Sequence, residues 1–136
     1  MKNTNPPPVV AANAVTSAEW TARQELAAVY RLVEHHGWAG DIFNHSAMRV
    51  PGEPRSFLIK RHDLLYTEVT ASNLVHCTFD RKIIEGEHGV DDTAFFLHAP
   101  VHKAVPAAKC VLHTHQPKAT ALCSIKGARI EPTHQY

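Results

Sequence analysis

The chain has little cysteine and no excess of charge of either sign. Its three cysteines, Cys77, Cys110 and Cys123, are an odd number without a CxxC pair, which argues against a disulfide framework and against a zinc ribbon. Reduced thiols in a cytoplasmic protein are therefore expected. Fourteen Lys and Arg balance thirteen Asp and Glu for a net charge of +1. Charge thus predicts neither nucleic acid nor an anionic membrane as a partner.

Long apolar runs and several common motifs are also absent. No apolar run approaches the ~20 residues of a membrane span, and the N-terminus lacks the basic and apolar regions of a secretory signal. The sequence contains no GxSxG, Walker A or GxGxxG motif. A length of 136 residues matches one globular domain.

The N-terminal part predicts a disordered tail over 1–15, with three consecutive prolines, followed by a helix over 17–36. Thr16 and Glu19 fit a capping box, in which the Glu19 side chain returns to the cap. Apolar residues then recur on one helical face. The opposite, polar face is expected to meet solvent and consists of Arg23, Glu25, Arg31 and Glu34.

Beyond this helix the sequence period changes to two. Residues 42–50 alternate as in a strand, 56–60 form a short apolar strand, and 64–66 are expected to be extended. The runs 73–79 and 83–85 read as a hairpin.

Helix and strand signals alternate again in the C-terminal half, which indicates a mixed α/β class. Asp91 and Asp92 are placed to cap a helix, and Pro100 is expected to kink or break it. The expected elements are a helix over 93–105, a buried strand over 109–115 and a helix over 117–126.

Histidine is the residue in excess, with eleven copies, and it is the commonest metal ligand. His113 and His115 lie two apart at the end of an apolar strand, so their side chains point to the same side. Such a pair suits zinc or another divalent metal, but a catalytic zinc needs about three protein ligands. Spacing alone therefore leaves a metal site and a structural pair open. His98 and His102, four apart on a helix, are expected to lie one toward the core and one at the surface.

Several ordered blocks resemble the class II aldolase/adducin family. The stretch 40–50 resembles its G-N-x-S-x-R segment, and 57–66 with 68–75 resembles its "fLI…lly.Eit.snLv" run. Residues 94–104 and 110–115 look like its helix and its "vvHtH" strand. The similarity covers about residues 17–130.

The resemblance implies a three-layer α/β/α sandwich around a mostly antiparallel sheet. Members often assemble as cyclic homotetramers with active sites between subunits. In the enzymes, the HxH pair and a later histidine hold zinc or a similar divalent metal. That metal polarises a substrate carbonyl and stabilises an enediolate, with small hydroxy-carbonyl or sugar-phosphate-like compounds as substrates, while a glutamate moves the proton.

Carried over by position, His113 and His115 match the first two metal ligands. Asn44 and Ser46 match a polar pair that holds the substrate's phosphate or polar end. Thr93 falls in the family's Ser-Ser-Glu element and is a further substrate-binding candidate.

The chain departs from the enzymes at three places. Ala94 stands where they carry the proton-transfer glutamate, as in the adducin-like branch, and His62-Asp63 replaces their phosphate-binding Ser-Gly. The family's third metal histidine normally lies in a part that would follow Tyr136, and His134, the only histidine after His115, does not align with it. Residues 16–136 are therefore expected to be a partial domain, truncated at the C-terminus.

These features support more than one function. The first is a metal-dependent lyase or aldolase, weak or inactive in this chain, with Asp91, Asp92 and Tyr66 as candidates for the missing acid/base. The second is a non-catalytic adducin-like assembly or cytoskeleton-binding module, although actin itself is not an expected partner. The third is an inactive, shortened copy of a longer enzyme.

Overall fold

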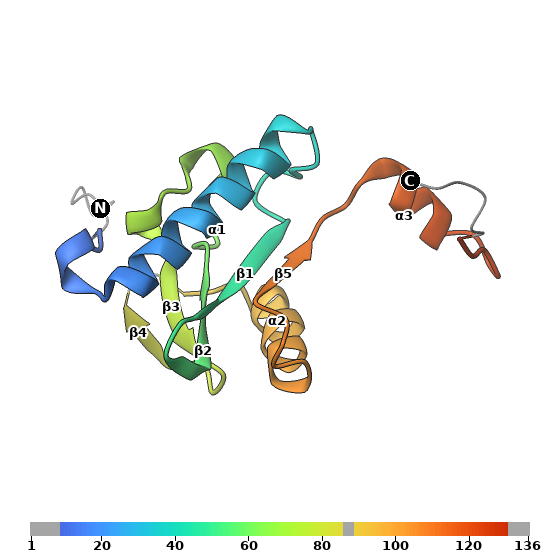
Figure 1. Cartoon of the computed structure of the whole chain (residues 1–136). Coiled ribbons are helices and arrows are strands. Elements are labelled where there is room, and N and C mark those ends of the chain that lie inside the picture. The colour runs from blue at the N-terminus through green and yellow to red at the C-terminus, as the bar shows by residue number, and fades with distance from the viewer. Residues whose placement is uncertain (1–8, 86–88, 131–136) are drawn as a thin grey trace, which may run out of the picture.

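A computed structural model describes residues 9–85 and 89–130. The strands form one antiparallel sheet in the order β4-β3-β2-β1-β5, with helices on its faces (Figure 1). This arrangement confirms the predicted mixed α/β class. The strands are β1 His45–Val50, β2 Glu53–Ile59, β3 Val75–Thr78, β4 Ile83–Glu85 and β5 Cys110–His113, and the α-helices are α1 Ser17–His35, α2 Asp92–Ala104 and α3 Pro117–Cys123.

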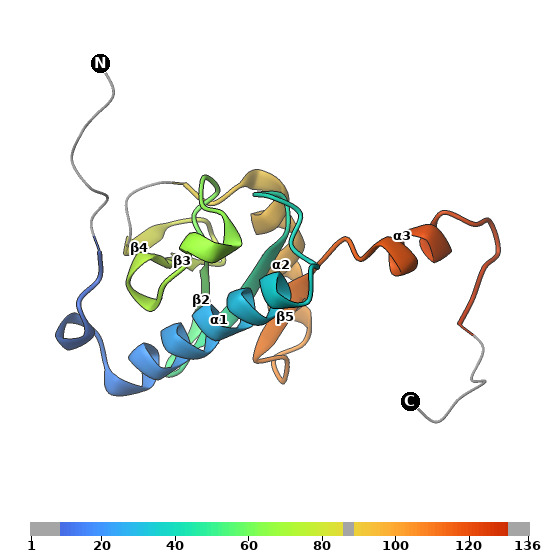
Figure 2. The same cartoon turned by 90° about the horizontal axis from the view of Figure 1, so that it is seen from above.

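The sheet is covered on both faces, which makes three layers. Neighbouring residues of a strand point to opposite faces. Leu58 accordingly packs with Leu26 and Tyr30 beneath α1, whereas Phe57 packs with Phe95 of α2 on the other face. Figure 2 shows α1 running along one side of the sheet. The α/β/α sandwich expected from the family resemblance is therefore present.

Helix α1 begins and ends as its sequence predicts, but its polar face is partly buried. The Thr16 Oγ1 accepts a hydrogen bond from the Glu19 N–H at 3.1 Å. The Glu19 carboxylate does not return to the cap: it accepts from Arg23 Nε at 2.9 Å. Arg23 is fully buried and also donates to the Leu74 carbonyl at 3.0 Å. The expectation that Arg23 faces solvent was wrong, because a loop 51 residues away covers it.

Two further local predictions needed correction. The segment expected to be extended over 64–66 leads into a 3-10 helix, η2, at Tyr66–Glu68. Helix α2 runs continuously past Pro100, so the break, one of the two expected outcomes, does not occur. Its first turn is capped as predicted, since the Asp91 carboxylate accepts from the Ala94 N–H at 3.0 Å.

Strand β5 is an edge strand, and α3 lies apart from the sheet. Both views show an extended segment carrying the chain from β5 to α3 (Figures 1 and 2). Leu112 is 52% exposed, so the prediction of a buried strand was wrong. Pro117 occupies the first turn of α3 as predicted, and no α3 residue is buried.

The predicted N-terminal tail is described only in part, because residues 1–8 lie outside the described ranges. Within 9–15, η1 forms at Ala12–Ala14. The Val10 N–H donates to the Ser72 carbonyl at 2.8 Å, which ties this segment to the loop before β3.

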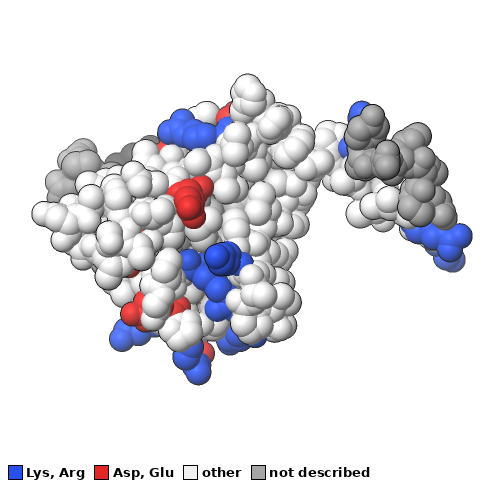
Figure 3. All heavy atoms as spheres, viewed as in Figure 1, with Lys and Arg blue, Asp and Glu red and all other residues white. Residues whose placement is uncertain are grey.

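The face seen in Figure 3 is mostly free of Lys, Arg, Asp and Glu, and both charge signs occur side by side where they gather. Such a mixture agrees with the net charge of +1. Within the described ranges, none of the helices has the length and apolar character needed to cross a bilayer.

Candidate functional site

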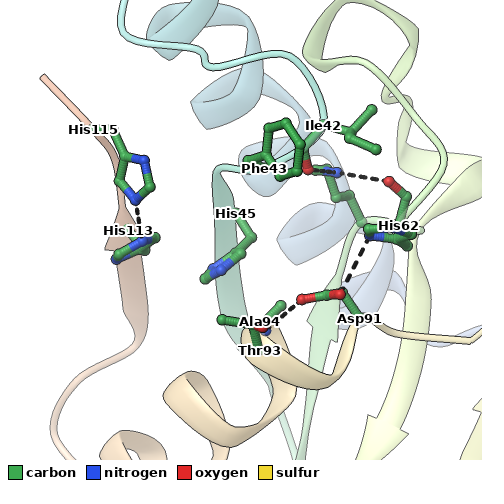
Figure 4. Close-up of a pocket in the computed structure, with 10 residues that line it drawn as sticks. Ile42, Phe43, His45, His62, Asp91, Thr93, Ala94, His113 and His115 are labelled. Atoms are coloured by element: carbon green, nitrogen blue, oxygen red, sulfur yellow. Dashed lines mark hydrogen bonds and ion pairs between the residues drawn. The ribbon is translucent and has the colours of Figure 1, made fainter.

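A cavity of about 290 Å³ lies where the start of β1, the end of β5 and the start of α2 meet. Figure 4 shows side chains from all three elements, and from the loop after β2, converging on it. The lining residues are Ile42, Phe43, His45, Lys60, His62, Asp91, Thr93, Ala94, His113 and His115.

His113 and His115 meet at this cavity as their spacing predicts. Their Nε2 atoms are 2.8 Å apart, with the rings edge to face. Burial and the neighbouring His115 lower the pKa of His113, which favours the neutral form that binds metals. Two nitrogens bound to one ion at about 2.0–2.1 Å lie roughly 3 Å apart, so this pair fits two neighbouring ligand positions. In the part of the chain that the structure describes, no three His, Cys, Asp or Glu side chains form a ready metal cluster.

His45 lies beside this pair and was not a predicted site residue. It faces His113 across β1 and β5, and the two rings stack at 4.7 Å. Its Nδ1 is 2.8 Å from His98 Nε2. The two residues are 4% and 0% exposed, and burial lowers the pKa of His45 to about 4 and that of His98 to about 3.

His98 and His102 do not divide between core and surface as predicted, because both are fully buried. His98 contacts His45, which lines the cavity, whereas the His102 ring stacks on Phe57 in the core. Only the first of the pair is therefore connected to the cavity.

Asn44 and Ser46 point away from the cavity, toward α1. Neither is among the lining residues, and both are fully buried. Asn44 Nδ2 donates to the Trp38 carbonyl at 2.8 Å, and the Ser46 N–H donates to the Tyr30 hydroxyl at 3.0 Å. Strand alternation puts His45 on the face opposite to Asn44 and Ser46, but only the packing of α1 and α2 shows that the His45 face meets the cavity.

Lys60 holds together the loops that form one wall of the cavity. Its buried Nζ donates to the Ile42 carbonyl at 2.9 Å and to the Leu64 carbonyl at 3.1 Å. Longer contacts reach the carbonyls of Arg61 and His62. Burial lowers the pKa of Lys60 to about 8. No motif in the sequence pointed to this residue.

The start of α2 supplies the remaining wall. Asp91 combines its capping role with an ion-pair contact to His62, whose Nδ1 is 3.5 Å from Asp91 Oδ1. Thr93 is exposed and lines the cavity. Ala94 is 3% exposed and presents only a methyl group there. The residue aligned with the family's proton-transfer glutamate thus does face the cavity.

The other acid/base candidates, and Asp63 of the pair that replaces Ser-Gly, lie elsewhere or are paired. Asp92 pairs with Arg81. Tyr66 is buried beneath α1, where burial raises its pKa. Asp63 accepts two hydrogen bonds from Arg61, which offsets its negative charge.

Comparison with known proteins places this architecture in a family. Residues 24–136 match the model of the Class II Aldolase and Adducin N-terminal domain. A Caulobacter vibrioides protein named for aldolase class 2 is 38% identical over 82% of this chain and 44% of its own length. Mouse alpha-adducin is 40% identical over 83% of this chain and 16% of its own. The chain therefore spans less than half the length of these curated relatives.

Solved structures show the same fold. An aldolase II superfamily protein from Pseudomonas syringae superposes with a TM-score of 0.87 at 34% identity, covering 93% of this chain and 51% of that one. The L-fuculose 1-phosphate aldolase from Glaciozyma antarctica gives a TM-score of 0.74 at 23% identity, covering 89% and 49%. Sequence motifs, fold and relatives agree: the chain belongs to the class II aldolase and adducin family.

Proposed function

We propose that this chain is a metal- and ligand-binding domain of the class II aldolase type, with His113 and His115 as ligands of zinc or a similar divalent ion. Class II aldolases generally depend on a divalent metal. The observation that carries the proposal is the convergence of the two Nε2 atoms, 2.8 Å apart, at the cavity. A metal bound there supplies a Lewis acid for a ligand's carbonyl oxygen.

The ligand class that suits the cavity is a small hydroxy-carbonyl compound. About 290 Å³ is at the lower limit of the ~300–1,000 Å³ common for ligand pockets. Thr93 offers a hydroxyl, and Lys60 places a buried cation in the wall. Asn44 and Ser46 do not touch the ligand in this proposal: Asn44 Nδ2 binds the Trp38 carbonyl after α1, and the Ser46 main-chain N–H binds the Tyr30 hydroxyl of α1.

The same cavity supports little or no lyase activity for the chain as it stands. Ala94 faces it with a methyl group, and a methyl group cannot accept or donate a proton. The carboxylate in the cavity wall is that of Asp91, which already accepts a hydrogen bond from the Ala94 N–H and contacts His62.

Calorimetric titration with zinc tests the binding part of the proposal. Wild type is expected to bind one ion, and His113→Ala to lose that binding. His36→Ala is the matched control, because His36 is exposed at the end of α1. Equal zinc binding by His113→Ala and wild type would overturn the proposed site.

Ala94→Glu tests the catalytic part. With zinc present, wild type is expected to exchange the hydroxymethyl protons of dihydroxyacetone phosphate with D₂O no faster than buffer does. A carboxylate at position 94 can accept such a proton, so Ala94→Glu should raise the rate, as NMR would show. Ala94→Gln is the matched control. Rapid exchange by wild type would contradict the proposed low activity.

A second candidate is a non-catalytic assembly module of the adducin type. The 40% identity with mouse alpha-adducin and the alanine at position 94 favour it. Family members are commonly oligomeric, and for this chain we propose a homotetramer in a reduced, cytoplasmic setting. Sedimentation velocity should then show one species four times the monomer mass, with or without zinc, whereas a monomer at all concentrations would contradict it.

A further inference from the structure

We infer that His45 is a ligand-binding residue of the cavity, which donates a hydrogen bond from Nε2–H to an oxygen of the bound compound. His98 is its positioning residue. The inference rests on the proposed function, because it names a residue by which the same cavity would bind its ligand. It adds a polar contact on the metal side of the cavity, which neither Asn44 nor Ser46 supplies.

The position of His45 is the first observation. The register of β1 against β5 pairs it with His113, and their rings stack at 4.7 Å and 17°. Figure 4 shows the His45 ring between the His113–His115 pair and the start of α2. An oxygen beside His113 is therefore also beside His45.

The hydrogen bond to His98 is the second observation. His45 Nδ1 and His98 Nε2 are 2.8 Å apart, so one of these nitrogens carries the proton and the other accepts it. His98 is fully buried, and its Nδ1 has no hydrogen-bond partner among the described residues. In one tautomer of this pair His98 Nδ1 therefore carries a proton, and in the other it does not.

The burial of His98 decides between them. If His45 Nδ1 donated, His98 Nδ1 would carry a buried N–H without an acceptor, and orphaned buried N–H groups are rare in folded proteins. If His98 Nε2 donates, His98 Nδ1 is a bare nitrogen and His45 Nδ1 accepts. The proton of His45 then sits on Nε2, on the cavity side of the ring.

A fixed N–H at a cavity wall recognises an acceptor. The described residues supply none to His45 Nε2, so a carbonyl, carboxylate or phosphate oxygen of the ligand is the partner. A neutral donor of this kind, aimed before the ligand arrives, needs little reorganisation on binding.

Long-range ¹H–¹⁵N correlation spectra of the full chain test the tautomer directly. We expect His45 to carry its proton on Nε2 in wild type. His98→Leu should weaken this preference toward that of a free imidazole, and His98→Gln, whose amide can donate to His45 Nδ1, should restore it. A proton on Nδ1 would overturn the inference, as would a zinc-dependent shift showing that His45 Nε2 binds the metal. Both results leave the His113–His115 site standing.

Binding of a probe tests the consequence. With zinc present, His45→Ala should bind dihydroxyacetone phosphate about tenfold more weakly than wild type, the loss of about one hydrogen bond, while zinc affinity stays unchanged. His45→Gln should bind it more tightly than His45→Ala. Equal affinity of His45→Ala and wild type would overturn the inference. Failure of wild type to bind zinc would instead contradict the proposed function. Thermal melts of each variant separate these effects from misfolding.

Discussion

The two sides of strand β1 carry polar groups of different kinds. On the side toward α1, Asn44 Nδ2 donates to the Trp38 carbonyl and the Ser46 main-chain N–H donates to the Tyr30 hydroxyl, while Asn44 Oδ1 and Ser46 Oγ are buried with no hydrogen-bond partner among the described residues. On the other side, His45 is held at one nitrogen by His98 and meets the cavity with the rest of its ring. Asn44 and Ser46 do not line the cavity, whereas His45 does, with a ring nitrogen that no described residue bonds. The α1 side is thus structural, and the α2 side is the candidate site.

The largest expected effect is on the α2 side. Replacement of either member of the His113–His115 pair should abolish zinc binding, because the remaining imidazole alone cannot form a specific site. The melting temperature without zinc should stay close to that of wild type, since neither side chain is fully buried. A large loss of stability in zinc-free His115→Ala would show that the pair is structural, like the polar groups on the α1 side.

The corresponding change on the α1 side is Tyr30→Phe. The Tyr30 hydroxyl accepts hydrogen bonds from the Ser46 and Lys60 N–H groups at 3.0 and 3.2 Å. Its removal leaves these buried groups unsatisfied, so urea denaturation should show a loss of about 1–3 kcal/mol. Zinc affinity should not change. Weakened zinc binding by a folded Tyr30→Phe would show that the two sides are coupled.

The stability of the protein should also depend on pH through His45 and His98 on the α2 side. The folded-state pKa values of about 4 for His45 and about 3 for His98 lie below the ordinary value of 6.5. Between these values the unfolded chain binds more protons, so the histidines keep their full stabilising contribution above pH 6.5 and lose it as the pH falls toward 3. Each contributes a slope of up to about 1.4 kcal/mol per pH unit. In urea denaturation of zinc-free protein, the free energy of unfolding of His45→Gln should change less steeply with pH than that of wild type. An unchanged dependence on pH would contradict the contribution assigned to His45.

The smallest expected effect belongs to Asn44→Ala. It removes a hydrogen bond of 2.8 Å to the Trp38 carbonyl and should cost about 1 kcal/mol of stability. Zinc and probe binding should be preserved in calorimetric titrations. A folded Asn44→Ala that no longer binds dihydroxyacetone phosphate would show that Asn44 does contribute to the ligand site.

The mixed α/β class and the shared side of the HxH pair could be predicted from local periodicity, whereas the three-layer sandwich was expected only from the family resemblance. A period of two brings His113 and His115 to one place without knowledge of the rest of the chain. Alternation also separates His45 from Asn44 and Ser46, but it does not say which side faces the cavity. That depends on where α1 and α2 pack, which the sequence of β1 alone does not contain.

Buried charges were missed for the same physical reason. Arg23 and Lys60 look like ordinary surface cations in sequence, yet each is enclosed by main-chain carbonyls. For Arg23 the carbonyl comes from a loop 51 residues away. The pairing of a cation with such distant groups is a property of the packed chain.

Native mass spectrometry of the whole chain with one equivalent of zinc tests whether His113 and His115 hold a metal ion. We expect one retained ion per chain in wild type and in the His36→Ala control, and none in His113→Ala. Retention of the ion by His113→Ala, or no retained ion in wild type, would contradict a metal site at His113 and His115.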